Sequence, residues 1–377
     1  MDFKLILKKV NNTLTTEENK IFEAWYSESK VHRDYFDKVK NNYSKGIDIV
    51  DVQKGWADVS IKIKKKKKSY SSYKYAAAVV LLFSTILTWY WNIENTEITP
   101  TLEPTVVHKK QIHIGSEKAT LTLEDGSKIL LEKGESFETD KASSNGEQLV
   151  YNKRRVPEES TSKNILTIPR GGQFFLVLND GTKVWVNSGT QIKYPVAFTA
   201  DKTREIELVY GEAYFDVSPS TEHNGSQFIV KTENQKIEVL GTEFNIKAYG
   251  DDDQISTTLV EGKVLVKNGN DSKSLTPGHQ SKIDRTTNKL VVSTVDVYNV
   301  ISWKDGLFSF KNQSLEDIMK VLSRWYDVDV TFKSESIKNL TFNGVFRKTL
   351  ELNEILNIIQ NTNEVNYEIN EKIITMK

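Results

Sequence analysis

The chain has 377 residues, of which 27% are charged and 38% hydrophobic, and its 51 basic residues balance its 51 acidic ones. This length allows two or three folded units. The sequence contains no cysteine, which excludes a disulfide framework, thiolate catalysis and an iron–sulfur cluster. The zero net charge hides two opposite parts: residues 1–74 hold 17 Lys+Arg and 10 Asp+Glu, a net of +7, so the remainder holds 34 and 41, a net of −7.

The N-terminal segment is predicted to be a small all-α unit of short helices. Thr15 stands three residues before Glu18, which is the signature of a capping box at the start of a helix. Apolar side chains then recur at helical spacing around Phe22, and two more amphipathic stretches follow, one around Phe36 and one over residues 49–63. We expect Phe22 and Phe36 to form the core of this segment.

This segment is expected to need a partner. Isolated helices below ~12–15 residues are marginal in water, and about 60 residues make a poor core alone. Large aromatic side chains dominate interface hot spots, so Trp25, Tyr26 and Trp56 are the predicted contacts. DNA is the weaker candidate, because the run Lys64–Lys68 supplies five of the 17 basic residues and suits anionic lipid headgroups. Without that run the net charge is only +2, which is weak for a nucleic-acid surface.

The stretch Tyr75–Trp91 is predicted to be a transmembrane helix. No charged residue lies between Lys74 and Glu94. Its 17 residues cover ~26 Å of helix at ~1.5 Å per residue, against a bilayer core of ~30 Å. Trp89, Tyr90 and Trp91 form an aromatic belt at one end, and lysines flank the other.

Topology follows from the same lysines, since positively charged flanks stay in the cytoplasm. The N-terminal segment is therefore expected inside the cell, and the part of the chain after residue 92 outside the cytoplasm. A cleavable signal peptide is not expected, because its apolar region would begin near the N-terminus rather than 75 residues into the chain.

Residues 115–300 are predicted to form an all-β domain. Short alternating apolar runs are broken by Asp-Gly pairs at Asp125 and Asp180, which suit tight hairpin turns. Residues 121–135 also align with residues 176–190, and two stacked hairpins are the simplest account of this repeat. Aspartate before glycine is mostly a turn residue, so we assign no catalytic role to Asp180.

Residues 303–377 are predicted to form a small α+β domain, in which strand–helix–strand occurs twice and the helices cover one sheet face. Ser314 caps the first helix, whose apolar face includes Trp325. Exposed sheet edges accept a strand from another chain, and Arg324, Trp325 and Tyr326 are the predicted partner contacts. Trp325 could equally pack the helix on its sheet, whereas Arg324 and Tyr326 are expected to be exposed.

The predicted architecture is therefore multidomain. Its parts, in chain order, are a cytoplasmic helical segment (1–74), one transmembrane helix (75–92), a polar linker (93–114), an all-β domain (115–300) and an α+β domain (303–377).

Several sequence motifs occur in a recognisable order. In the outer part they are Pro169 to Gln173 and residues 180–195, 211–217, 239–249, 257–264 and 277–280. Together they closely resemble FecR-type regulators, in the version common in Bacteroidetes-like bacteria. Residues 303–332 are similar to the family's trailing domain, which resembles the short N-terminal signalling domain of secretins and TonB-dependent transducers. Residues 14–25 look like the family's anti-sigma segment.

The resemblance implies a single-pass anti-sigma factor of the inner membrane. The N-terminal segment would hold an extracytoplasmic-function sigma factor in the cytoplasm. The outer part would lie in the periplasm and sense the signalling domain of an outer-membrane TonB-dependent transducer, and so control transcription of uptake genes. The family implies no enzyme activity, no catalytic or metal site and no cofactor. Membrane lipid is a further expected contact, and nucleic acid is not.

Two other function classes compete with this interpretation. An enzyme is disfavoured because the sequence contains neither a G-x-S-x-G motif nor a phosphate-binding loop. The alternative is a membrane-tethered periplasmic glycan-binding protein, since aromatic residues of the outer part could stack on sugars, although most of them alternate along strands as core residues do. These aromatics are Trp185, Tyr194, Tyr210, Tyr214 and Phe215.

Overall fold

The structure, a computed structural model, describes residues 8–9, 13–28, 33, 36, 40, 112–152, 162–199, 201–362 and 365–377. The chain divides into two compact units, Met1–Pro104 and Thr105–Lys377. The predicted transmembrane tract, the lysine run before it and Trp56 lie outside the described residues. Of the helices that the structure describes, none is both long enough and apolar enough to cross a membrane.

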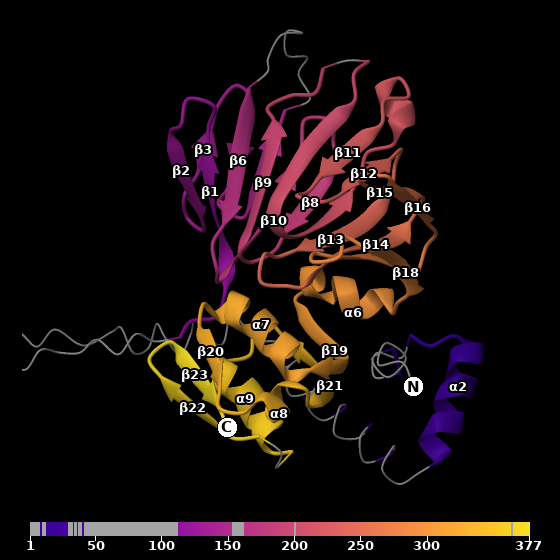
Figure 1. The fold of residues 1–377 in the computed structure, drawn as a ribbon, viewed down its shortest axis with the longest axis vertical. Helices are drawn as coiled ribbons and strands as arrows, with labels where there is room; N and C mark the ends of the chain where they lie inside the picture. Colours follow the sequence, from indigo (N-terminus) through magenta and orange to yellow (C-terminus); the bar gives the residue numbers. More distant parts are fainter. Residues whose placement is uncertain are drawn as a thin grey trace, which may run out of the picture. The chain divides into compact units, whose positions relative to one another are not determined.

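In the first unit, α2 (Thr16–Glu28) is the helix that the capping-box signature predicts (Figure 1). The backbone N–H of Thr15 donates to Glu18 Oε2 at 3.0 Å, and the backbone N–H of Glu18 donates to Thr15 Oγ1 at 3.3 Å, so both halves of the box are formed. Phe22 and Phe36 are 1% and 8% exposed, with ring centroids 4.9 Å apart. Their predicted role as the aromatic core of this segment is confirmed.

In the second unit, the strands between residues 116 and 294, which we call the β-sandwich, form one hydrogen-bonded network that divides into two sheets (Figure 1). The first sheet has the order β2 (Lys128–Glu132), β1 (Ser116–Thr122), β6 (Lys163–Ile168), β9 (Thr190–Pro195), β10 (Arg204–Asp216), β11 (Phe228–Lys231), β12 (Lys236–Val239), β15 (Val264–Asn268) and β16 (Asp271–Leu275). The second has the order β3 (Phe137–Glu138), β4 (Ala142–Ser144), β5 (Gln148–Tyr151), β7 (Gly172–Val177), β8 (Lys183–Val186), β10, β13 (Glu243–Ala248), β14 (Gln254–Glu261), β17 (His279–Asp284) and β18 (Leu290–Thr294). A short 3₁₀ helix, η2 (Ser220–His223), follows β10.

Strand β10 passes from the first sheet to the second at Gly211. Residues 207–210 pair with β9, whereas residues 211–216 pair with β8 and β13. Gly211 has a φ of 104°, and a Cβ at this position would overlap with Thr190. Only glycine therefore fits the crossing that joins the two sheets.

One hydrophobic core lies between the two sheets, and strands such as β6 and β9 alternate buried and half-buried residues along it. The predicted all-β pattern of this region is confirmed. Both halves of the internal repeat form hairpins, β1–β2 and β7–β8. In each turn the aspartate accepts a hydrogen bond from the backbone N–H two residues later, from Ser127 to Asp125 (2.8 Å) and from Thr182 to Asp180 (2.9 Å).

Asp180 has a second partner that the turn motif does not predict. Its Oδ2 lies 2.8 Å from Arg204 Nη1, and the two side chains are 3% and 2% exposed. Arg204 also donates to the backbone carbonyls of Ser218 (2.9 Å) and Ser226 (3.0 Å). This buried ion pair fixes the β7–β8 turn to the start of β10.

After β18 the chain passes through α6 (Val297–Ile301) and η3 (Ser302–Asp305) into the C-terminal domain. Ser314 caps α7 as predicted, since its hydroxyl accepts from the backbone N–H of Asp317 at 3.1 Å. The elements of this domain are β19 (Leu307–Ser314), α7 (Leu315–Tyr326), β20 (Asp329–Phe332), α8 (Glu335–Lys338), β21 (Thr341–Arg347), α9 (Leu352–Gln360), β22 (Tyr367–Asn370) and β23 (Ile373–Met376).

The C-terminal strands form two small sheets, not the single sheet that the sequence suggested. Strand β19 pairs with β21, and separately β20, β23 and β22 pair in that order. The difference arises because β20 pairs in parallel with the last strand, β23, so each strand–helix–strand unit gives its first strand to one sheet and its second to the other. Helices α7 and α9 share one core with strands of both sheets, which includes Phe308, Ile318, Leu356 and Ile374.

Candidate functional site

The predicted partner contacts Arg324, Trp325 and Tyr326 form the last turn of α7 and are 8%, 4% and 1% exposed. Trp325 packs in the C-terminal core, as one of its two interpretations predicted, whereas the expectation that Arg324 and Tyr326 are exposed is wrong. Their contact with a transducer stays a prediction.

The last turn of α7 is covered by residues from the β-sandwich and from the end of β21. We call this set of contacts the junction; it comprises Gly115, Arg170, Gly171, Tyr249, Asp251, Asp252, Arg324, Trp325 and Lys348.

Arg324 closes the junction against the turn between β13 and β14. Its Nη2 lies 2.7 Å from Asp251 Oδ1 and 3.2 Å from Asp252 Oδ1, and its guanidinium carbon is 3.7 Å from the centre of the Tyr249 ring. Burial acts to raise the pKa of Asp252, but the charges of Lys247 and Arg324 outweigh it and hold that pKa below its ordinary value. The buried guanidinium is therefore paired with a carboxylate, as a buried charge requires.

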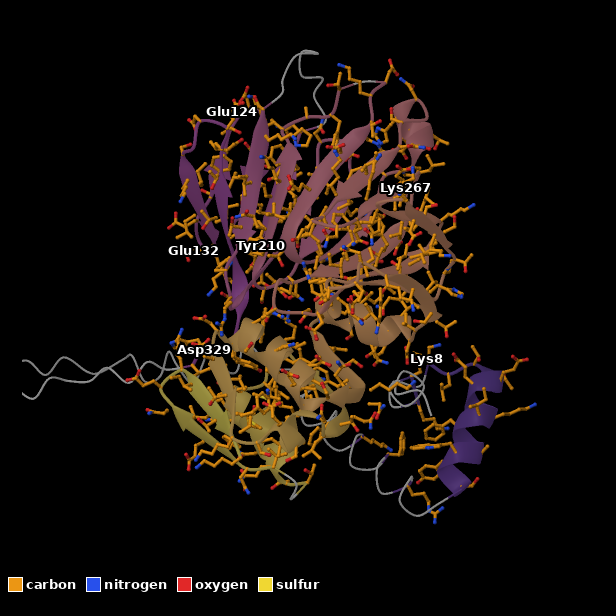
Figure 2. The ribbon with its side chains drawn as sticks, in the orientation of Figure 1. Lys8, Glu124, Glu132, Tyr210, Lys267 and Asp329 are labelled. Carbon is orange, nitrogen blue, oxygen red and sulfur yellow. The ribbon has the colours of Figure 1, made fainter. Side chains whose placement is uncertain are left out.

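Arg170 fastens the loop between β6 and β7 onto the end of α7. Its Nη1 lies 2.8 Å from Asp329 Oδ1, and its Nε lies 3.5 Å from Asp327 Oδ1. The next residue, Gly171, donates its backbone N–H to the carbonyl of Arg324 at 2.7 Å. Figure 2 shows Asp329 where the C-terminal domain borders the β-sandwich. The Arg-Gly pair of the sequence motif thus positions the C-terminal domain.

Trp325 is the side chain around which the junction is packed. Its Nε1 donates to the carbonyl of Lys348 at 3.0 Å, and Lys348 Nζ lies 3.6 Å from the ring centre. A Cβ at Gly115 would lie 2.6 Å from the indole, so the ring rests directly on the Gly115 backbone. Ile112 and Ile114 pack against the same C-terminal core. The C-terminal domain therefore holds the end of the predicted linker just before it enters β1.

Lys348 is a buried lysine, 3% exposed, that sequence reasoning missed. Its Nζ donates to Gln173 Oε1 at 2.7 Å, and it lies over the ring of Trp325. Burial lowers the pKa of Lys348 to about 7, and the carboxylates of Glu212 and Glu117 oppose this only in part. The lysine follows an arginine at the end of a strand, and no local pattern marks it as buried.

Tyr326 belongs to the core of the C-terminal domain. Its hydroxyl donates to the carbonyl of Leu350 at 2.6 Å, and its ring centroid lies 6.4 Å from that of Phe308. Burial, with smaller contributions from the Glu351 and Glu354 carboxylates, raises the pKa of Tyr326 above its ordinary value. Its hydroxyl therefore remains a hydrogen-bond donor that links α7 to the start of α9.

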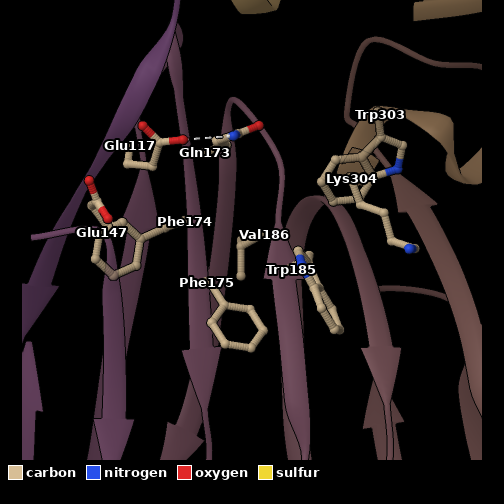
Figure 3. Close-up of a pocket in the computed structure, with 9 residues that line it drawn as sticks. All are labelled: Glu117, Glu147, Gln173, Phe174, Phe175, Trp185, Val186, Trp303 and Lys304. Atoms are coloured by element: carbon tan, nitrogen blue, oxygen red, sulfur yellow. Dashed lines mark hydrogen bonds between the residues drawn. The ribbon is translucent and has the colours of Figure 1, made fainter. Parts of the chain in front are cut away.

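An open cleft of about 330 Å³ lies on the outer face of the second sheet (Figure 3). Its floor is formed by Phe175 of β7 and Trp185 of β8, which are opposite each other in register with ring centroids 4.8 Å apart. Glu117 and Glu147 lie along one side, and Lys304 lies along the other (Figure 3). The remaining residues that line the cleft are Gln173, Phe174, Val186 and Trp303.

In the first unit, Trp25 and Tyr26 are half-buried beside Phe22. Their ring centroids lie 5.9 Å and 5.6 Å from that of Phe22. Part of each side chain therefore remains open to a partner. The third predicted contact, Trp56, lies outside the described residues, and contact of these three aromatics with a sigma factor stays a prediction.

Comparison with known proteins links both domains of the second unit to one family. A family model described as FecR protein matches residues 164–265, and one described as FecR, C-terminal matches residues 307–376. Two crystal structures of a proposed anti-sigma factor from Parabacteroides distasonis ATCC 8503, at 1.65 Å and 2.50 Å resolution, are similar at 28% sequence identity and a TM-score of 0.52. They cover 56% and 57% of this chain and 98% of the solved chain. No curated protein matches. The chain thus contains a FecR domain followed by a FecR C-terminal domain, and its resemblance to FecR-type proteins is confirmed.

Proposed function

We propose that the chain is a single-pass anti-sigma regulator of the inner membrane. Residues 1–74 hold an extracytoplasmic-function sigma factor in the cytoplasm. Residues 92–377 lie in the periplasm, sense the signalling domain of a TonB-dependent transducer and so control transcription of uptake genes. The observation that carries this proposal is the combination, in one chain, of both FecR domains with a capped helix whose aromatic residues are only half-buried. The similarity to a proposed anti-sigma factor supports it.

The junction supplies a route for the signal through the periplasmic part. The ring of Trp325 rests on Gly115, the residue before β1, so a change in the C-terminal domain acts directly on the end of the linker. Because Arg324 and Tyr326 are buried, we propose the sheet edges of the C-terminal domain as a second candidate docking surface for the transducer, to be tested beside these residues. Among the described strands of this domain, β19 and β21 pair only with each other, and β20 and β22 pair only with β23. Each of these four strands therefore has an unpaired edge, and such edges accept a partner strand.

A two-hybrid assay of residues 1–74 against every extracytoplasmic-function sigma factor of the same genome tests the cytoplasmic half. We expect one interacting pair. Trp25→Ala and Trp56→Ala should each weaken it by about 2 kcal/mol, the scale of a hot-spot aromatic. Phe22→Ala is the matched control for loss of fold, because Phe22 is 1% exposed. It should reduce helicity in circular dichroism, which the other two variants should leave unchanged. Absence of any interacting pair would remove the anti-sigma proposal.

A reporter assay of the sigma factor's target genes tests the periplasmic half. Deleting residues 303–377 should make expression independent of the transducer's inducer while the protein stays in the membrane. The deletion also uncovers Gly115, so Arg170→Ala serves as a milder companion that leaves the C-terminal domain in place and removes its ion pairs with Asp327 and Asp329. We expect Arg170→Ala to shift the uninduced level and to retain induction. A normal response from the deleted protein would place sensing in the β-sandwich.

A further inference from the structure

The outer face of the second sheet carries a row of aromatic side chains across β7, β8 and β10. Phe175 lies opposite Trp185, and Trp185 lies opposite Tyr214, with centroid distances of 4.8 Å and 5.5 Å. Tyr214 is 3% exposed and lies under Lys304, whose Nζ is 5.1 Å from the ring centre. Phe175 and Trp185 are only half-buried and form the floor of the cleft. Lys304 Nζ also lies 5.7 Å from the centre of the Trp185 ring, so a ligand that stacks on the exposed part of this half-buried ring would lie beside the ammonium group.

The sides of this cleft carry charges of both signs (Figure 3). Glu117 and Glu147 lie on one side, and Lys304, whose Nζ also pairs with Asp305 Oδ1 at 3.0 Å, lies on the other. The carboxylates would attract a cation, but the ammonium group would repel it. The ammonium group would attract an anion, but the carboxylates would repel it. Hydroxyl groups can donate to a carboxylate and accept from an ammonium group, so they suit both sides at once. The mixed lining therefore favours a neutral ligand with several hydroxyl groups.

We propose that this cleft binds a neutral saccharide of one or two pyranose rings. One ring face stacks on Trp185, and the hydroxyl groups bond to Glu117 and Lys304. The volume of about 330 Å³ is at the small end of the ~300–1,000 Å³ typical of ligand sites, which matches a ligand of this size. This binding site goes beyond the anti-sigma function and does not depend on it.

Of the five aromatic residues that suggested glycan binding in the sequence, Trp185 is the one that is partly exposed and lines the cleft. Tyr194 and Phe215 are 0% exposed and belong to the core, and Tyr214 is covered. Tyr210 is 39% exposed, but it pairs with β9 in the other sheet and does not line the cleft (Figure 2). Tyr210 is therefore a suitable control for an exposed aromatic outside the site.

Gln173, which lines the cleft, contacts Lys348 of the junction. Gln173 Nε2 donates to Glu117 Oε1 at 3.1 Å, while Gln173 Oε1 accepts from Lys348 Nζ at 2.7 Å. A saccharide hydroxyl that bonds to Glu117 competes with Gln173 for that carboxylate. Occupation of the cleft thus changes a contact that also holds the buried lysine of the C-terminal domain.

Saturation-transfer NMR on the full chain, in a detergent without a sugar headgroup, tests this proposal. The probes are the methyl pyranosides of glucose, galactose, mannose, xylose and N-acetylglucosamine, together with maltose and cellobiose. Arginine amide serves as a cationic probe. The proteins are the wild type, Trp185→Ala, Trp185→Phe, Glu117→Gln and the control Tyr210→Ala, each checked for fold by circular dichroism.

We expect at least one saccharide to bind the wild type and Tyr210→Ala equally. Trp185→Ala should bind it about tenfold more weakly, the scale of one aromatic contact, and Trp185→Phe should restore part of the loss. Glu117→Gln should also weaken binding. The proposal is overturned if no saccharide binds the wild type, if Trp185→Ala binds as well as the wild type, or if arginine amide alone gives a signal that depends on Trp185. None of these results affects the sigma-factor assay, so the two proposals can fail separately.

Discussion

Replacing Lys348 by methionine should remove a pH-dependent part of the stability of the periplasmic unit. Methionine keeps most of the side-chain length but cannot carry a proton. In the wild type, Lys348 Nζ lies over the ring of Trp325 and donates to the neutral amide of Gln173. Burial therefore favours the neutral form of the amine and lowers the pKa of Lys348 from the ordinary 10.5 to about 7.

The sign follows from the proton balance. Between pH 7 and pH 10.5 the unfolded chain still binds the proton of Lys348 while the folded chain has released it, so the free energy of unfolding rises with pH in this window. Each pH unit in the window is worth about 1.4 kcal/mol. Since release in the folded state is only half complete at pH 7, the gain from pH 7 to pH 9 should be about 2 kcal/mol.

Urea denaturation of residues 105–377 at pH 6, 7, 8 and 9 measures this effect. The wild type minus Lys348→Met difference in unfolding free energy should change little between pH 6 and pH 7 and then rise by about 2 kcal/mol to pH 9. Lys273→Met, at an exposed position of β16, is the control and should give no such rise. A flat difference curve for Lys348→Met would show that the lysine keeps its proton in the folded protein and would refute the reasoning.

Three further predictions concern the buried ion pair, the junction and the topology. Asp180→Ala should lower the free energy of unfolding by about 3–5 kcal/mol in urea denaturation, because it leaves the buried guanidinium of Arg204 without its carboxylate partner. A loss below about 1 kcal/mol would mean that water solvates the guanidinium in the variant. Gly115→Ala should cost about 1–3 kcal/mol through overlap with Trp325, and should add little in a Trp325→Ala background; full additivity of the two would contradict the contact. Alkaline phosphatase fused after Asn299 should be active, and fused after Ser60 inactive, and the opposite pattern would reverse the predicted orientation.

Local patterns predicted the elements whose structure is set by nearby residues. The reciprocal Thr15–Glu18 bonds and the Ser314 cap are formed within four residues of sequence, so the sequence alone contains the whole interaction. The Asp-Gly hairpins and the alternation along β6 and β9 were predictable for the same reason, since the turn and the pleat each impose a short period.

Long-range contacts decide the features that the sequence did not reveal. Helical spacing correctly placed Trp325 on the apolar face of α7, but it left Arg324 and Tyr326 outside that face. Asp251 of the β-sandwich covers Arg324, and the carbonyl of Leu350 covers Tyr326. The spacing of apolar residues along one helix does not predict which other parts of the chain cover its remaining faces. The same limit explains the division of the C-terminal strands into two sheets, because it depends on the parallel pairing of β20 with β23.

The burial of Arg324, Trp325 and Tyr326 changes what a mutation at these positions can reveal. Each side chain has partners outside α7, so its removal disturbs the β-sandwich, the end of the linker or the start of α9. A loss of signalling in such a variant would therefore be expected even if the transducer never touches these residues. To show that the junction transmits the signal, an experiment must find two conformations of the periplasmic part whose balance is shifted both by the transducer and by changes at the junction. Variants on the edge strands of the two C-terminal sheets must be compared with variants of the junction before either role is assigned.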